Sequence, residues 1–422
     1  MNISIKKLRS CLFGLLVISF NFGNHFKIAG MSISQCIALI VMLFSVVDLM
    51  EIFPNYNKLK KEKRIVLFLI LAWGVISIIQ VLWVSDMAWW KHGIRTLFIN
   101  LLICLEMCVL FKDNKDYLIV MKSVELSLLL SIMIGLYENF RGVHFDSDPK
   151  DLVYGFLNIR GFIGNSNDFA SWIILCLLGV TLYYSKKKRK YVCIIEWLLG
   201  AYVVRLTGSR AGVLSVVFGI FFILVGNILK LGEETKNRLP QKRKVLHILG
   251  IVSVVAAGGM FLLGSDVIAF INNVSSASSS DVFRLSIIED SLKVALKYVF
   301  IGAGADQTTF YVGINPHNFL LELLADYGIL IVGIIVFILW KIFIRIFESK
   351  KITGYGIACY AFVPTFLMIS IASSSMARLR MTWVVLLLYY FVSAEQVEER
   401  KYRRRIVLRT LERSNLEKLQ VR

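Results

Sequence analysis

Residues 64–84 read RIVLFLILAWGVISIIQVLWV, with Arg64 at the start as the one charged residue. A helix of about 20 apolar residues crosses the hydrocarbon core of a bilayer. Similar stretches recur along the chain: 57% of its 422 residues are hydrophobic, 18% are charged, and the mean hydropathy is +0.68. Soluble domains have about 45–50% apolar and about 25% charged residues. The sequence therefore predicts an all-α protein with many membrane spans. It excludes a cytosolic enzyme, a secreted disulfide scaffold and a disordered protein.

We expect a polytopic membrane domain over residues 1–399 and a basic cytoplasmic tail over residues 400–422. All seven cysteines fall within apolar stretches, which argues against disulfides and against a cysteine metal site. The predicted spans number about twelve. They lie at about 8–22, 31–50, 64–84, 93–111, 117–137, 168–185, 191–207, 211–229, 245–264, 317–340, 354–372 and 380–394.

The basic residues alternate between connectors. Lys and Arg gather after the even-numbered spans, for example in segments 58–64, 186–190, 230–244 and 341–351. Cytoplasmic connectors collect these residues, so both termini are predicted to be cytoplasmic. The formal net charge of +19 then reflects orientation and attraction to anionic lipid rather than nucleic-acid binding.

Two long connectors are predicted on the outer side, at about 138–167 and at about 265–316 between spans 9 and 10. Structureless connectors of this length are uncommon unless they serve a function. Within the second, Leu285, Ile288 and Leu292 recur at helical spacing. This pattern predicts an amphipathic helix over about 282–300 that lies on the bundle or in the lipid interface.

Two arginines stand at outer membrane edges. Arg210 lies in a glycine-rich turn over residues 207–212, and Arg284 lies in the first turn of the predicted amphipathic helix. An Arg in such a place can simply reach toward lipid headgroups. Its planar guanidinium also matches phosphate oxygens with two parallel hydrogen bonds.

His317 follows Pro316, a residue that favours the first turn of a helix. At the positive end of a helix dipole an imidazole is favoured in its neutral form, which can accept a proton as a general base. A structural role in the loop is the alternative. Asn318 and Glu322 share a helix face one turn apart. Glu322 and Asp326 lie inside an apolar span, where carboxylates are costly unless they face a wet cavity.

A fourth motif, RGFIGNSN at residues 160–167, leads into the sixth span. Its paired glycines and asparagines suit a re-entrant turn whose amides face a polar ligand. It can equally be a helix cap, with Asn167 or Asp168 as the capping residue.

The order of these motifs resembles that of the O-antigen ligase and polymerase superfamily over residues 160–328. An Asn-x-Asn turn precedes one span and Ser209-Arg210-x-Gly precedes a later one. A long outer loop with an Arg and a Gly-x-Gly follows, and His-Asn opens the next span before Gly328. The resemblance implies a C-type membrane glycosyltransferase fold and a glycan donor carried on polyprenyl pyrophosphate.

Carried over motif by motif, the resemblance implies that Arg210, Arg284 and His317 are the catalytic residues. Transfer from a lipid pyrophosphate needs cations for the leaving group and a base for the acceptor hydroxyl. We therefore expect the two arginines to hold the pyrophosphate and His317 to deprotonate the acceptor. The candidate substrate-binding residues are Arg160, Asn165, Asn167, Ser209, Asn318, Glu322, Lys91 and Arg95.

We expect a metal-independent reaction without a cofactor. The competing reading is a divalent metal at Asp146-Ser147-Asp148, which has the Asp-x-Asp spacing of many glycosyltransferases.

Within the superfamily, we expect a polysaccharide polymerase that joins lipid-linked repeat units for a capsule, an exopolysaccharide or O-antigen. A ligase that transfers the glycan to a terminal acceptor is the alternative. An alternative from another class of protein is a transporter, a flippase for lipid-linked sugars. The number of spans suits a flippase, and Glu106, Glu125 and Glu196, which lie within or near spans, are consistent with one.

The expected location is the bacterial cytoplasmic membrane, with the active site on the outer face. The expected partners are the lipid-linked donor and acceptor and membrane lipid, without nucleic acid. A chain-length regulator and a flippase of the same pathway are further candidate partners.

Overall fold

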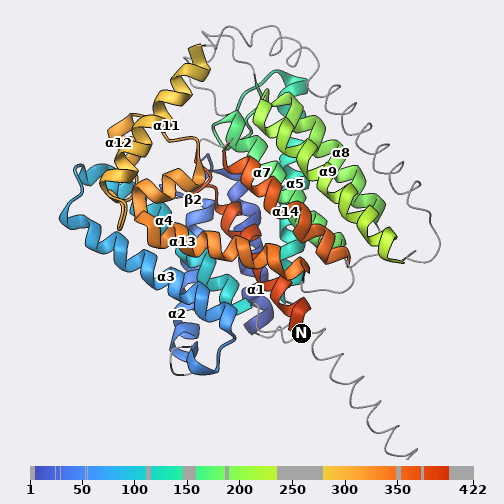
Figure 1. Ribbon diagram of the computed structural model, residues 1–422, viewed down its shortest axis with the longest axis horizontal. Coiled ribbons are helices and arrows are strands. Elements are labelled where there is room, and N and C mark those ends of the chain that lie inside the picture. The colour runs from blue at the N-terminus through green and yellow to red at the C-terminus, as the bar shows by residue number, and fades with distance from the viewer. Residues whose placement is uncertain are drawn as a thin grey trace, which may run out of the picture.

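The computed structural model describes residues 5–23, 25–28, 30–52, 54, 56–110, 116–145, 158–185, 190–234, 279–347, 353–371 and 375–398. This part of the chain is helical (Figure 1), with one short antiparallel pair of strands, β1 (Lys27–Ile28) and β2 (Met31–Ser32). The fold is all-α, as predicted.

The helices follow the predicted order. The α-helices are α1 (Ile5–Ser19), α2 (Ile33–Ile52), α3 (Lys61–Ile79), α4 (Met87–Leu110), α5 (Asp116–Arg141), α7 (Ser166–Tyr184), α8 (Lys190–Leu206), α9 (Arg210–Glu234), α11 (Ser279–Lys297), α12 (Gln307–Val312), α13 (Phe319–Phe347), α14 (Gly354–Ser370) and a last helix over 380–398. Short 3-10 turns are η1 (Phe20–Phe22), η2 (Tyr56–Lys58) and η3 (Gln80–Leu82).

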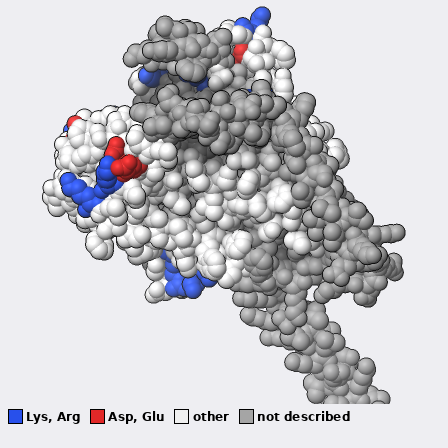
Figure 2. Space-filling model, turned by 45° about the horizontal axis from the view of Figure 1, so that its top comes forward, with Lys and Arg blue, Asp and Glu red and all other residues white. Residues whose placement is uncertain are grey.

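Six stretches in the described part are long and apolar enough to cross a membrane. They include α3 to α5, α7, α9 and α13, and shorter apolar helices such as α14 accompany them. On the face shown in Figure 2, most of the described surface is free of charged side chains, as expected of a surface that contacts lipid. The predicted span at 245–264 lies outside the described residues.

The core forms around α7 and the last helix, both apolar on every side. Such helices become buried on all faces, and Trp172 in α7 and Trp383 in the last helix are almost fully buried. Helix α7 packs against α5, α8, α9 and α14. Aromatic rings connect the last helix to its neighbours: the rings of Trp73 and Trp383 are 4.8 Å apart, and those of Phe362 and Tyr389 stack at 4.0 Å.

The two long connectors contain more helix than predicted. Helix α5 continues to Arg141, so the first connector begins later than residue 138. In the second, α11 begins at Ser279 and covers most of the range predicted for the amphipathic helix, and the short helix α12 follows it. Ile287 and Ala295 of α11 are buried, while Leu285 and Leu292 of the predicted apolar face are exposed. Figure 1 shows α11 and α12 together at one corner of the molecule, away from α8 and α9.

A close backbone crossing connects the end of this second connector to α13. The amide of Ala303 donates to the carbonyl of Ala325 (2.8 Å), and the amide of Ile329 donates to that of Val299 (2.8 Å). Helix α13 is interrupted at Gly328, whose φ of 80° lies in the left-handed region. The Gly-x-Gly and Gly328 motifs therefore meet in space, at the point where the two backbones touch.

Replacing Gly302 by Ala is expected to lower the free energy of unfolding by about 2 kcal/mol or more. Gly302 has φ +75°, and a Cβ there would lie 2.2 Å from the carbonyl oxygen of Asp326. Thermal denaturation of the purified protein in detergent measures the loss. Gly333→Ala is the matched control, because nothing lies within 4 Å of its Cβ position. A Gly302→Ala variant as stable as the control would contradict the crossing.

Candidate active site

A cavity of about 620 Å³ lies at one end of the helical bundle. It is bounded by η1, α4, the start of α7 and the segment that leads into the last helix. The side chains around it are unusually polar for an apolar bundle. They belong to Phe20, Gly23, His25, His92, Thr96, Phe162, Ile163, Asp168, Trp172, Asn315, Ser375, Arg378, Leu379 and Arg380.

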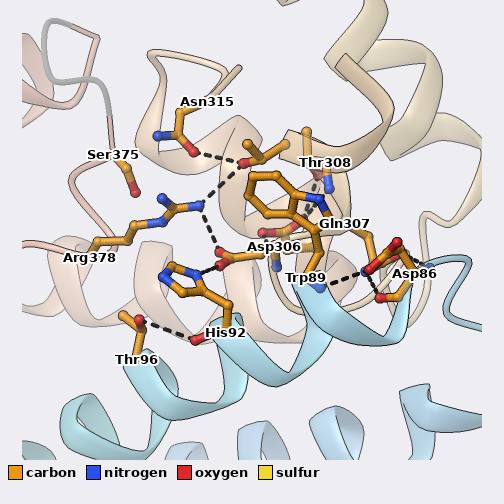
Figure 3. A network of polar contacts seen from close by, with 12 residues as sticks. Asp86, Trp89, His92, Thr96, Asp306, Gln307, Thr308, Asn315, Ser375 and Arg378 are labelled. Atoms are coloured by element: carbon orange, nitrogen blue, oxygen red, sulfur yellow. Dashed lines mark hydrogen bonds and ion pairs between the residues drawn. The ribbon is translucent and has the colours of Figure 1, made fainter. Parts of the chain in front are cut away.

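Asp306 connects two of the lining residues (Figure 3). Its Oδ1 atom accepts a hydrogen bond from Nη2 of Arg378 (2.9 Å), and its Oδ2 atom lies 2.6 Å from Nδ1 of His92. The Asp306 residue is only 4% exposed. Three segments far apart in the sequence are thus joined at one carboxylate: α4, the turn before α12 and the segment before the last helix.

The turn that carries Asp306 is held by a second carboxylate. Asp326 in α13 accepts hydrogen bonds from the amides of Asp306 (3.1 Å) and Thr308 (2.9 Å) and from the Thr308 hydroxyl (2.6 Å). Asp306 itself has φ 59°, a left-handed conformation that Asp tolerates better than most residues. The buried Asp326 therefore fixes where the Asp306 side chain points.

Arg378 is the positive charge at the centre of this group. Burial lowers the pKa of its guanidinium, but the nearby carboxylates of Asp306, Glu322 and Asp326 outweigh burial and raise that pKa. Arg378 is thus held in its charged form. Glu322 is buried behind the cavity wall, where its Oε1 atom accepts a hydrogen bond from the hydroxyl of Ser375 (2.5 Å).

His317 lies just before α13, and not within its first turn as predicted. The helix begins at Phe319, and Asn318 caps it by accepting a hydrogen bond from the amide of Leu321 (3.1 Å). The backbone of His317 is left-handed, with φ 52°, which is incompatible with a helical turn. His317 is half-buried and stands two residues after Asn315, which lines the cavity.

Arg210 is the first residue of α9 and is exposed. Ser209 before it is buried, and its hydroxyl accepts a hydrogen bond from the amide of Gly212 (3.1 Å), so it caps the helix. A Cβ on Gly212 would lie 2.8 Å from the Cβ of Ala170, the fifth residue of α7. This contact brings the start of α9 to the end of the bundle where the cavity lies, although Arg210 is not one of the lining residues.

The 160–167 motif forms a turn against the end of α5. The buried carboxylate of Glu138 accepts hydrogen bonds from the amides of Arg160 (3.0 Å) and Gly161 (2.7 Å). The helix-cap interpretation of this motif is confirmed, but the cap is Asn165 and not Asn167 or Asp168. Its side chain accepts a hydrogen bond from the amide of Asn167 (2.8 Å), as the extended backbone of Asn165 allows.

The remaining predicted residues fall into two groups. Lys91 and Arg95 are exposed on α4, each one position before a lining residue, His92 or Thr96. The backbone of Arg284 lies in α11, but its side chain is outside what the structure describes, as are Asp146 and Asp148. In the described part of the chain, no group of three His, Cys, Asp or Glu side chains could hold a metal ion.

None of the residues that line the cavity was among the predicted site residues. The missed residues that decide the charge of the site are His92, Asp306, Arg378 and Arg380. One signal for the arginines was present, because Arg378-x-Arg380 precedes the last apolar span just as Arg210 precedes an earlier one. His92 and Asp306 gave no such signal, since their partnership joins positions more than 200 residues apart.

A family model described as O-antigen ligase matches residues 197–338. The resemblance to the O-antigen ligase and polymerase superfamily is thereby confirmed. The match covers about a third of the chain, from within α8 to within α13, and it contains Arg210, Arg284 and His317. It leaves out His92, Arg378 and Arg380. A comparison with curated proteins finds no match.

The family match and the apolar helices together support a multi-pass membrane protein with an O-antigen ligase-type domain. The family match indicates a glycosyltransferase-like activity. The cavity at one end of the bundle is the place in the described structure where polar groups suited to such chemistry converge.

Proposed function

We propose that the protein is a membrane glycosyltransferase that joins repeat units carried on polyprenyl pyrophosphate at the outer face of the cytoplasmic membrane. The observation that carries this proposal is the O-antigen ligase match over residues 197–338. The polar cavity supports it, because the starts of α7 and α9 and the turn before α13 lie around or close to it.

The chemistry follows from the bonds that change. The acceptor hydroxyl attacks the anomeric carbon of the donor glycan, the bond from that carbon to the pyrophosphate breaks, and the lipid pyrophosphate leaves with the electron pair. Arg210 and Arg284 are proposed to neutralise this leaving group. His317 is proposed to accept the proton of the attacking hydroxyl.

A ligase is the second candidate, because it is the activity in the family description. A ligase and a polymerase share the donor and differ in the acceptor. We favour the polymerase because the sequence has no feature tied to a lipid A acceptor.

A flippase is less well supported. Two of the three carboxylates that favoured it have structural partners. Glu106 forms a buried ion pair with Arg9 (2.6 Å), and Glu125 accepts a hydrogen bond from the hydroxyl of Tyr184. Both contacts are of the kind that holds spans together, so these carboxylates do not require an ion path.

Mass analysis of lipid-linked glycans in a strain that lacks the protein tests the proposal. Loss of a polymerase leaves single repeat units on the lipid. Loss of a ligase leaves long polymers on the lipid instead, and unchanged lipid-linked glycans would contradict both enzymatic functions.

A further inference from the structure

Three side chains that the proposed mechanism does not use face one cavity: Arg378, Arg380 and His92. We refer to them as the Arg378 cluster. His92 comes from α4, Arg378 from the segment before the last helix and Arg380 from the start of that helix. All three lie outside the stretch that matches the family model.

Both guanidinium groups have hydrogen-bond donors to spare. Nη2 of Arg378 donates to Asp306 (2.9 Å) and to the hydroxyl of Thr309 (3.3 Å). Its Nε atom is buried and has no hydrogen-bond partner in the described part of the chain, and the same holds for Nε of Arg380. A buried N–H group without an acceptor is costly. Two guanidinium groups that line one polar cavity suit a ligand that brings several acceptor oxygens.

The arrangement of the cluster suits an anion. Arg380 is fixed by its contact with the Phe20 ring (5.2 Å) and by a hydrogen bond to Ser34 (3.4 Å). Figure 3 shows the second terminal nitrogen of Arg378 pointing away from Asp306, on the side of Ser375 and Asn315. Planar guanidinium groups of this kind match phosphate oxygens in pairs.

One carboxylate, that of Asp168, lines the cavity together with the cations, whereas Asp306, Glu322 and Asp326 are buried and are not lining residues. Both oxygens of Asp306 are engaged by Arg378 and His92. Because Asp306 binds Nδ1 of His92, the Nε2 atom is the ring nitrogen left for a ligand. Asp306 is thus placed to aim two members of the cluster, and we assign it as a positioning residue.

We propose that the Arg378 cluster is a second diphosphate-binding site, which holds the lipid diphosphate of the acceptor glycan. This inference rests on the proposed function, because there Arg210 and Arg284 hold the donor. Arg210 is not a lining residue of this cavity. A polymerase has to hold two lipid diphosphates at once, whereas a ligase has to hold one.

The test counts binding sites directly. The full-length protein in lipid nanodiscs is titrated with farnesyl diphosphate, a short polyprenyl diphosphate, by isothermal titration calorimetry. We expect two sites in the wild type. One site should remain in Arg378→Gln/Arg380→Gln, and one should remain in Arg210→Gln/Arg284→Gln. The matched control Lys27→Gln removes one exposed charge two residues after the lining residue His25 and should keep both sites.

Two ligand arms identify the chemistry. Farnesyl monophosphate should bind the site that depends on Arg378 at least about tenfold more weakly than the diphosphate, because it offers fewer oxygens to the guanidinium groups. Inorganic pyrophosphate should also bind it more weakly than the lipid diphosphate. Equal binding of pyrophosphate would make the free anion the ligand and overturn the acceptor assignment.

Asp306→Asn separates positioning from simple charge. Removal of a negative charge alone would tighten the binding of an anion. If Asp306 aims Arg378 and His92, the Kd of this site should instead rise about tenfold. Tighter or unchanged binding in Asp306→Asn would overturn the positioning role.

A single site in the wild type, or two sites that both survive Arg378→Gln/Arg380→Gln, would overturn the inference. The number of diphosphate-binding sites is measured without glycan transfer. The experiment can therefore contradict the second binding site and the proposed function independently. Glycan transfer by a protein with one site would contradict this inference alone, and two sites without transfer would contradict the proposed function.

Discussion

Replacement of His317 by Asn is expected to reduce glycan transfer by about 100-fold or more, the usual size of a general-base contribution. The backbone of His317 is left-handed, with φ 52°. Asn is one of the residues that adopt this conformation readily. The substitution therefore keeps the turn before α13 and removes the group that can accept a proton. Polymer length and initial rate in proteoliposomes measure the effect.

The matched control for this variant is His144→Gln. His144 lies three residues after the end of α5, with Nδ1 3.9 Å from Glu138, and has no assigned role in the reaction. Its variant should keep transfer within about twofold, and both variants should insert into the membrane in wild-type amounts. Normal polymer length in His317→Asn would reject the base assignment.

Replacement of Asp326 by Ala is expected to destabilise the protein by about 3 kcal/mol or more and to abolish transfer. Three donors of the turn over residues 306–308 would lose their acceptor in a buried place, at about 1–3 kcal/mol for each unsatisfied group. The turn carries Asp306, so Arg378 and His92 would also lose their anchor. Thermal denaturation in detergent and the transfer assay measure the two effects.

Asp290→Ala provides the comparison. Asp290 is an exposed carboxylate of α11 that pairs with Lys293 at 3.0 Å. Exposed ion pairs of this type contribute about 0–1 kcal/mol, so its loss should barely change the melting temperature. If Asp326→Ala has the same melting temperature as Asp290→Ala, the hydrogen bonds of Asp326 do not hold the turn over residues 306–308.

Much of the fold was predictable from the sequence, because a span needs only local information. The apolar stretch at 64–84 and its counterparts predicted the helices, since length and composition decide whether a helix suits a bilayer. The helix in the second long connector was predictable for the same reason, but its buried face was not. Ile287 and Ala295 are buried, whereas Leu285 and Leu292 of the predicted apolar face are exposed.

The site was predictable only in part. Gly302 and Gly328 are recognisable in the sequence as residues of the family motifs. The close approach of their backbones depends on a crossing that no local sequence pattern predicts. The start of α13 was predicted two residues too early, at residue 317, because Asn318 and not Pro316 determines where the helix begins. The side chain of Asn318 caps the helix. His92 and Asp306 meet only through the packing of α4 against α12, so they could be found only in three dimensions.

Reconstitution tests the central claim most directly. The purified protein is placed in liposomes with a lipid-linked repeat unit and no ion gradient, and the lipid-linked products are separated by size. We predict that the glycan becomes longer, in a manner that depends on His317 and Arg210. Repeat units that cross the bilayer without growing would contradict the account, because movement without a new glycosidic bond is the work of a transporter.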